Sequence, residues 1–154
     1  MILAFSIVCN VIRCWTLRHI AWPALSVESY IFPRWVLDDQ PVELATRSGG
    51  TITGIPYTQE CNDVAMMLIQ HHSAREYYDR AMDQFEQLHH DARDSARVMA
   101  LVVHPYIMGA PHRLKWFRKV IEELTRRDDV VFWTGSQILD WFRAEQHRIN
   151  GAGS

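Results

Sequence analysis

The hydrophobic pattern is clearest at Val98–Val103, where six apolar residues follow one another without a polar interruption. A continuous apolar run of this length is typical of a parallel strand that is covered on both faces. His104 follows the run directly, and Pro105 prevents its simple continuation as a strand. We therefore expect a buried strand that ends at His104.

Apolar positions at helical spacing predict helices on both sides of this strand. Ser73–Glu76 has the capping-box pattern, and an apolar stripe runs from Tyr77 to Leu88. Pro111 suits the first position of a further helix. Thr134–Gln137 is a second capping box, which opens the last predicted helix. Upstream, either Asn62 or Asp63 is expected to cap a short helix.

Two shorter segments have the pattern of strands. Thr51–Ile55 alternates and is stopped by Pro56, and the turn Ser48–Gly50 precedes it. Val130–Trp133 is a short apolar run between two predicted helices. The order strand, helix, strand, helix predicts parallel βα units. A closed eight-unit barrel needs ~250 residues, and 154 residues are too few to close one.

The two ends of the chain lack a clear pattern. Residues 1–34 are apolar at the start but have no clean period, and we leave this segment unassigned. Arg13 interrupts the apolar run well short of the ~20 residues that span a bilayer. A membrane span is therefore not expected, although weak membrane anchoring stays open. Residues 148–154 are expected to form a flexible tail.

Composition and charge exclude some classes of function. The chain carries a formal net charge of -2, which argues against a nucleic-acid partner because such a partner favours a basic face. Cys9, Cys14 and Cys61 have no metal-binding spacing, and their odd number fits a reducing compartment. We therefore expect a cytoplasmic protein.

His104 is the leading candidate for chemistry, because ligands gather at the carboxyl ends of strands in α/β proteins. The alternative is a buried histidine whose ring nitrogens bond to the backbone. Asp38 and Asp39 form a second candidate, with a solvated turn before Pro41 as the alternative. The adjacent pairs among the eight histidines point to different sides of a helix, and no two histidines are four apart.

Four blocks of sequence resemble the polysaccharide deacetylase family, in its allantoinase-like and peptidoglycan-deacetylase-like branch. They are WVLDDQPV (35–42), IPYTQECNDV (55–64), VVHPYIMGAPHR (102–113) and VVFWTGSQILDWF (130–142). The resemblance implies an α/β fold in which residues 35–147 form the C-terminal part of a deacetylase-type (β/α) barrel. The N-terminal half of such a barrel is missing from the chain.

The resemblance also implies an activity, the hydrolysis of non-peptide carbon–nitrogen bonds in N-acetyl sugars or ureides. His104 would protonate the leaving nitrogen, a role that suits imidazole, and Asp38 or Asp39 would support it. Glu60 and Asn62 would lie in a substrate-facing loop. Tyr57 and Tyr106 would line the pocket. Helix capping by Asn62 and core packing of the aromatic residues are the alternatives.

The chain departs from the family in lacking its early Asp-Asp pair and its two histidines spaced by four. We therefore predict no metal site and no cofactor in this chain, although a divalent metal such as zinc is expected in full-length relatives. The predicted function is a truncated form that is inactive alone, with a glycan or small-molecule substrate. A homo-oligomer, or a partner, would supply the missing half.

The alternative prediction is a non-catalytic remnant or interaction protein. Half a barrel would expose strand edges and apolar faces, through which it would associate.

Overall fold

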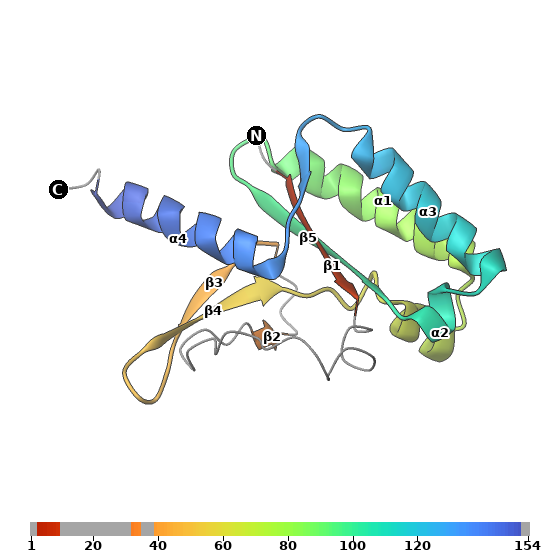
Figure 1. The fold of residues 1–154 in the computed structure, drawn as a ribbon, viewed down its shortest axis with the longest axis horizontal. Coiled ribbons are helices and arrows are strands. Elements are labelled where there is room, and N and C mark those ends of the chain that lie inside the picture. The colour runs from red at the N-terminus through yellow and green to blue at the C-terminus, as the bar shows by residue number, and fades with distance from the viewer. Residues whose placement is uncertain (1–2, 10–31, 35–38, 152–154) are drawn as a thin grey trace, which may run out of the picture.

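A computed structural model describes residues 3–9, 32–34 and 39–151 and shows a mixed α/β fold (Figure 1). Three strands form a parallel sheet in the order β5-β1-β6. They are β1 (Leu3–Cys9), β5 (Arg97–Val103) and β6 (Val130–Phe132). The predicted strand before His104 is thereby confirmed. Its central neighbour β1 comes from the segment that the sequence pattern left unassigned.

A second sheet of three strands has the order β2-β4-β3. β4 (Thr51–Pro56) pairs in parallel with β2 (Phe32–Arg34) and antiparallel with β3 (Val42–Ala45). The turn between β3 and β4 contains Gly49 at a φ of 87°, a conformation that glycine adopts without steric cost. This turn is the one predicted at Ser48–Gly50.

The predicted helices are present in the predicted order, and the structure adds one short helix directly after His104, where a turn was expected. They are η2 (Val64–Ile69, a π-helix), α1 (Ala74–Asp91), α2 (Pro105–Met108), α3 (Pro111–Thr125) and α4 (Gly135–Gly151). α4 therefore continues to Gly151, into the segment expected to be a tail. Trp35–Leu37 has the pattern of the end of a further short strand, and these residues lie outside the described ranges.

Both predicted capping boxes are formed. The Ser73 backbone N–H donates to the Glu76 carboxylate at 2.6 Å, and the Glu76 N–H donates to the Ser73 hydroxyl at 3.3 Å. At α4, the Thr134 N–H donates to Gln137 Oε1 at 2.8 Å, and the Gln137 N–H donates to the Thr134 hydroxyl at 3.3 Å. These bonds satisfy backbone donors that the first turn of a helix cannot satisfy itself.

The core lies on both faces of the parallel sheet. Because side chains alternate along a strand, Met99, Leu101 and Val103 of β5 share one face. They belong to a cluster with buried residues of α1 and α3, which pack side by side (Figure 1). Val98 belongs to a second cluster, with Ile138 of α4. The sheet is thus covered as its continuous apolar strand predicted.

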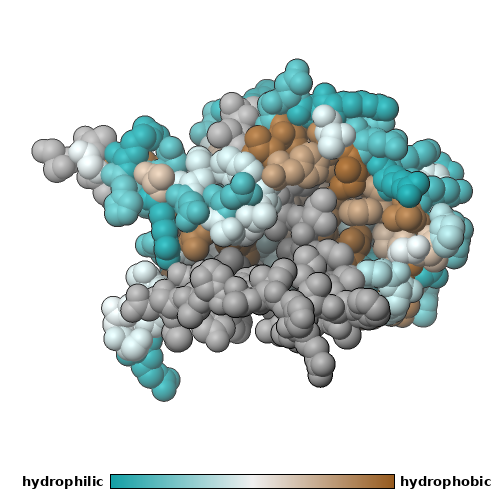
Figure 2. Space-filling view, in the orientation of Figure 1, coloured by the Kyte–Doolittle hydropathy of each residue, from teal (hydrophilic) through white to brown (hydrophobic). Residues whose placement is uncertain are grey.

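Hydrophilic and hydrophobic residues occupy different parts of the face shown in Figure 2. Hydrophilic residues cover the outer sides of α3 and α4, and hydrophobic residues gather over the region of α1 and α3 (Figure 2). Within the described ranges, none of the helices combines the length and apolar character needed to cross a membrane. Those ranges form two separate three-stranded sheets.

Candidate active site at the end of strand β5

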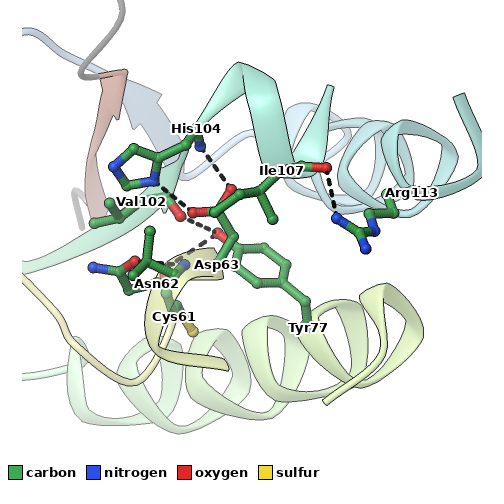
Figure 3. Close-up of polar contacts among 9 residues, drawn as sticks. Cys61, Asn62, Asp63, Tyr77, Val102, His104, Ile107 and Arg113 are labelled. Atoms are coloured by element: carbon green, nitrogen blue, oxygen red, sulfur yellow. Dashed lines mark hydrogen bonds and ion pairs between the residues drawn. The ribbon is translucent and has the colours of Figure 1, made fainter. Parts of the chain in front are cut away.

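The site is centred on His104, which follows the last residue of β5 and is the residue before α2. Its backbone N–H donates to Asp63 Oδ2 at 2.6 Å, and its ring Nδ1 lies 2.6 Å from Asp63 Oδ1 (Figure 3). The Asp63 side chain is fully buried, whereas the His104 side chain is 17% exposed. One carboxyl group therefore fixes both the backbone and the ring of the same residue.

The loop before η2 holds Asp63 in this position by pairing with β5. Asn62 forms a parallel β-bridge with Val102, and the Val102 N–H donates to the Cys61 carbonyl at 2.9 Å. The buried hydroxyl of Tyr77, on α1, lies 3.2 Å from the Cys61 carbonyl oxygen and 3.4 Å from that of Val102. The loop and the end of β5 are thus joined by backbone contacts and by the Tyr77 side chain of α1 (Figure 3).

Asn62 and Asp63 have different roles. The Asn62 side-chain oxygen accepts the Val64 N–H at 3.0 Å, so this residue caps the helical turn, as one of its two interpretations predicted. Asp63 is the residue before η2 but makes no side-chain hydrogen bond to that helix. Its carboxyl group is directed to His104 instead.

The partners of the His104 ring determine which nitrogen carries the proton. A carboxylate only accepts hydrogen bonds, so Nδ1 is the donor to Asp63. Nε2 then lies on the side of the ring away from Asp63 (Figure 3). An imidazole held in this way can accept or deliver a proton at Nε2 while Nδ1–H stays bonded to the carboxylate. The geometry is that of an oriented general acid or base.

Two of the predicted pocket residues lie near this pair. The Tyr106 ring approaches the His104 ring edge-on, with 5.7 Å between centroids, and the residue is 73% exposed. Tyr57 is half-buried, and burial together with the negative charge of Asp63 raises its pKa. Tyr106 is therefore accessible beside His104, and Tyr57 lies close enough to Asp63 to be affected by its charge.

Glu60 lies in the same loop, on the surface. Its carboxylate accepts the Thr58 hydroxyl at 3.2 Å, and its carbonyl accepts Arg80 Nη1 at 3.2 Å. The structure therefore places it within the predicted substrate-facing loop, and its role in substrate binding stays a prediction.

Asp39 is not brought together with His104. It lies 3.2 Å from Arg97 Nη1, and its carbonyl accepts the Val98 N–H at 2.7 Å, so it sits where β5 begins. β5 rises about 3.3 Å per residue, which puts roughly 20 Å between the two ends of the strand. Asp39 therefore lies near the opposite end of β5 from His104, and the carboxyl group that contacts the histidine is that of Asp63. Asp38 lies outside the described residues.

Sequence reasoning missed Asp63 as a site residue because its position suggested a helix cap. A polar residue just before an apolar helical segment is the usual pattern of an N-cap. The partner of Asp63 is 41 residues away, and no local spacing connects the two. The resemblance to a family did place Asp63 inside a matching block, but its role there was not inferred.

The described residues do not form a metal site. No group of three or more His, Cys, Asp or Glu side chains in that part of the chain is placed to hold an ion. Their donor set therefore does not fit the divalent metal expected in full-length relatives.

Cys61 is a structural thiol in this arrangement. It is fully buried, and its Sγ donates to Gln84 Oε1 at 2.8 Å. Burial raises its pKa to about 12. Because the thiolate is the nucleophilic form, this thiol is unreactive at neutral pH.

Comparisons with known proteins agree with the relationship that the sequence blocks suggested. No family model matches the chain. A Schizosaccharomyces pombe protein described as "Putative polysaccharide deacetylase" is 25% identical over 116 residues. The matched region is 74% of this chain and 36% of that protein. The chain thus spans little more than a third of the length of this curated relative.

Two solved structures share the fold. Puue allantoinase matches with a TM-score of 0.67 at 22% identity, over 73% of this chain and 38% of its own. A "probable Polysaccharide deacetylase" from Pseudomonas aeruginosa PAO1 matches with a TM-score of 0.65 at 22% identity, over 72% of this chain and 38% of its own. The chain thus shares the fold of these two proteins over about 72% of its length.

Proposed function

We propose that this chain provides the proton-donating part of a polysaccharide deacetylase-like hydrolase. The substrate would carry a non-peptide carbon–nitrogen bond, in an N-acetyl sugar or a ureide. The observation that supports this proposal best is the contact of the buried Asp63 carboxyl group with both the backbone and the ring of His104. The relatives named above supply the class of reaction.

In the proposed step, His104 acts as the tetrahedral intermediate collapses. The carbon–nitrogen bond breaks, its electron pair goes to the leaving nitrogen, and the proton on His104 Nε2 passes to that nitrogen. The ring becomes neutral and keeps its Nδ1–H on Asp63. The products are an amine and acetic acid from an N-acetyl sugar, or a urea N–H group and a carboxylic acid from a cyclic ureide. Tyr106, exposed beside the ring, would contact the group that leaves.

The described residues do not provide the other half of the reaction. A water molecule must be activated, and the described part of the chain contains no metal-ligand cluster for this purpose. A lone acid keeps only a small part of the catalysis that an acid, a base and an electrostatic site provide together. We therefore propose that the chain alone is inactive, and that the missing half of a (β/α) barrel would restore activity.

A chimera tests the proposal directly. The matched 116-residue region of the Schizosaccharomyces pombe relative would be replaced by the corresponding region of this chain. Release of acetate from N-acetylglucosamine oligomers and hydrolysis of allantoin would then be measured. We expect turnover in the chimera and none in the chain alone. His104→Ala should abolish turnover while the chimera stays folded, as shown by circular dichroism.

A matched control is available in the same region. His89 and Asp129 form another histidine–aspartate pair at 2.6 Å, and Asp129 is 39% exposed. Asp129→Asn should leave turnover of the chimera unchanged. Equal turnover in the parent chimera and in His104→Ala would remove His104 from the mechanism.

A further inference from the structure

A second concave site lies between the first turns of α1 and α3, apart from the His104–Asp63 pair. It is an open hollow of about 320 Å³. No acidic residue lines it. Apart from Ala74, the lining residues are polar or aromatic: His72, Ser73, Arg75, His112, Arg113 and Trp116. Such a lining is unusual in a chain whose formal net charge is -2.

Positive charge is concentrated around the Trp116 ring. Lys119 Nζ lies 4.8 Å from the ring centroid, Lys115 Nζ lies 5.3 Å away, and Arg75 Cζ lies 5.8 Å away. Cation–π attraction holds these groups near one ring although they repel one another. An anion bound in the adjacent hollow would relieve that repulsion.

The acidic residues close to the hollow only partly balance this charge. Asp79 lies 3.9 Å from Arg75, and both side chains are exposed. The Glu76 carboxylate is engaged by the Ser73 N–H in the capping box, and this bond lowers its pKa. Within the described residues, Arg113, Lys115 and Lys119 have no carboxylate within ion-pair distance. Arg113 uses one donor, Nη1, on the Ile107 carbonyl at 3.2 Å.

His72 lines the hollow and carries a ring N–H. Its Nδ1 lies 3.0 Å from Arg80 Nη2, and a guanidinium group can only donate. Nδ1 is therefore the acceptor, and the ring proton is on Nε2. The positive ends of two helices of 18 and 15 residues reach the same hollow, and helix N-termini favour negative charge.

We propose that this hollow binds a phosphate or carboxylate group carried by the substrate. Arginine binds both groups through paired hydrogen bonds. Arg75 and Arg113 would hold the anion from two helices, and the His72 Nε2–H would add a third donor.

The position of the hollow connects it to the candidate active site. α2 follows His104 directly, and Arg113 bonds to the Ile107 carbonyl on α2. An extended glycan could thus place a reacting bond at His104 and an anionic substituent in the hollow. The assignment of the anion to a glycan rests on the proposed function, whereas anion binding itself does not.

Binding of defined probes to the whole chain tests this proposal without any hydrolysis. Isothermal titration calorimetry at low ionic strength would compare inorganic phosphate, N-acetylglucosamine 6-phosphate, N-acetylmuramic acid and neutral N-acetylglucosamine. We expect the anionic sugars to bind and the neutral sugar to bind at least tenfold more weakly. The stronger of the phosphorylated and the carboxylated sugar identifies the anion. Binding should weaken as added salt screens the charges.

Two variants and one control assign the binding to the hollow. Arg75→Gln and Arg113→Gln should each weaken binding about tenfold, the usual effect of losing one charge-assisted hydrogen bond. The Arg75 side chain is 71% exposed, so its replacement leaves the core intact. Arg118→Gln removes the same charge from an exposed position of α3 outside the hollow and should bind like the parent chain.

Three results would overturn the proposal: no binding of any anionic probe, equal binding of the neutral sugar, or equal affinities of the Arg75→Gln and parent chains. If anion binding is present but the chimera described above is inactive, the hydrolase proposal fails and the anion site stands.

Discussion

Replacing Asp63 by asparagine is the sharpest test of the site, because it keeps the shape of the side chain and removes one acceptor. In the parent chain the two carboxyl oxygens serve two donors of His104, each at 2.6 Å. The asparagine oxygen can satisfy only one of them. The amide NH₂ group then faces the other of the two His104 donors, and two donors cannot form a hydrogen bond with each other.

The expected loss in the free energy of unfolding follows from the burial of the Asp63 side chain. Losing one charge-assisted hydrogen bond costs about 1.5–3 kcal/mol, and leaving a buried donor without a partner costs about 1–3 kcal/mol more. The His104 ring can recover part of this by moving its proton to Nε2 and accepting from the amide through Nδ1. We therefore expect the free energy of unfolding to fall by about 2–4 kcal/mol in Asp63→Asn.

The control is Asp129→Asn, which changes a histidine–aspartate pair of the same 2.6 Å separation near the surface. Exposed pairs contribute about 0–1 kcal/mol, so the difference between the two variants isolates the effect of burial. Urea unfolding at neutral pH would measure both free energies. Long-range ¹H–¹⁵N correlation spectra would report the tautomer of His104. Equal destabilisation of the two variants, with the proton still on Nδ1 in Asp63→Asn, would refute the assigned pair.

Three further outcomes are expected. Tyr77→Phe removes the hydroxyl that joins the Cys61 and Val102 carbonyls and should cost about 1 kcal/mol in urea unfolding; an unchanged midpoint would contradict this. Gly109→Ala should cost about 1–3 kcal/mol, because an added Cβ would collide with the Pro105 carbonyl oxygen; full stability would show that the turn is more open. Burial raises the pKa of Cys61 to about 12 from the ordinary value of 9.0, so the stability contribution of the neutral thiol is present below pH 9 and is lost as the pH rises toward 12. Peptide mapping after iodoacetamide treatment at neutral pH should find Cys61 unmodified until urea unfolds the chain, and rapid labelling in the folded chain would be the contrary result.

The sequence predicted well those elements whose signal is local. The six apolar residues of β5 could be identified because both faces of the strand are covered, so no polar residue interrupts the run. Ser73 and Thr134 were identified as caps because a capping box needs only two residues three positions apart. Their hydrogen bonds do not depend on the rest of the fold.

The sequence predicted poorly what depends on distant contacts. β1 pairs with two strands that lie more than 80 residues further along the chain. Its own apolar run has no regular period from which a strand could be predicted. Asp39 was a candidate site residue with a solvated turn as the alternative, and Asp63 was expected only as a possible helix cap. Only the fold decides that Asp63 reaches the carboxyl end of β5 and that Asp39 reaches its beginning.

The contacts of Asp63 also imply that His104 can be oriented as an acid in a chain that has no turnover. Its carboxyl group bonds the backbone and the ring of His104 together, and the loop that carries it is paired with β5 through Val102. Every group in this assembly belongs to the described part of one chain. The orientation of His104 is therefore set when the loop docks on β5, before any missing half of the site is supplied. It follows that the chain alone should show the Nδ1–H tautomer of His104 even where it shows no turnover. A disordered His104 in a folded chain would mean that the missing half is needed to build the acid as well as to activate water.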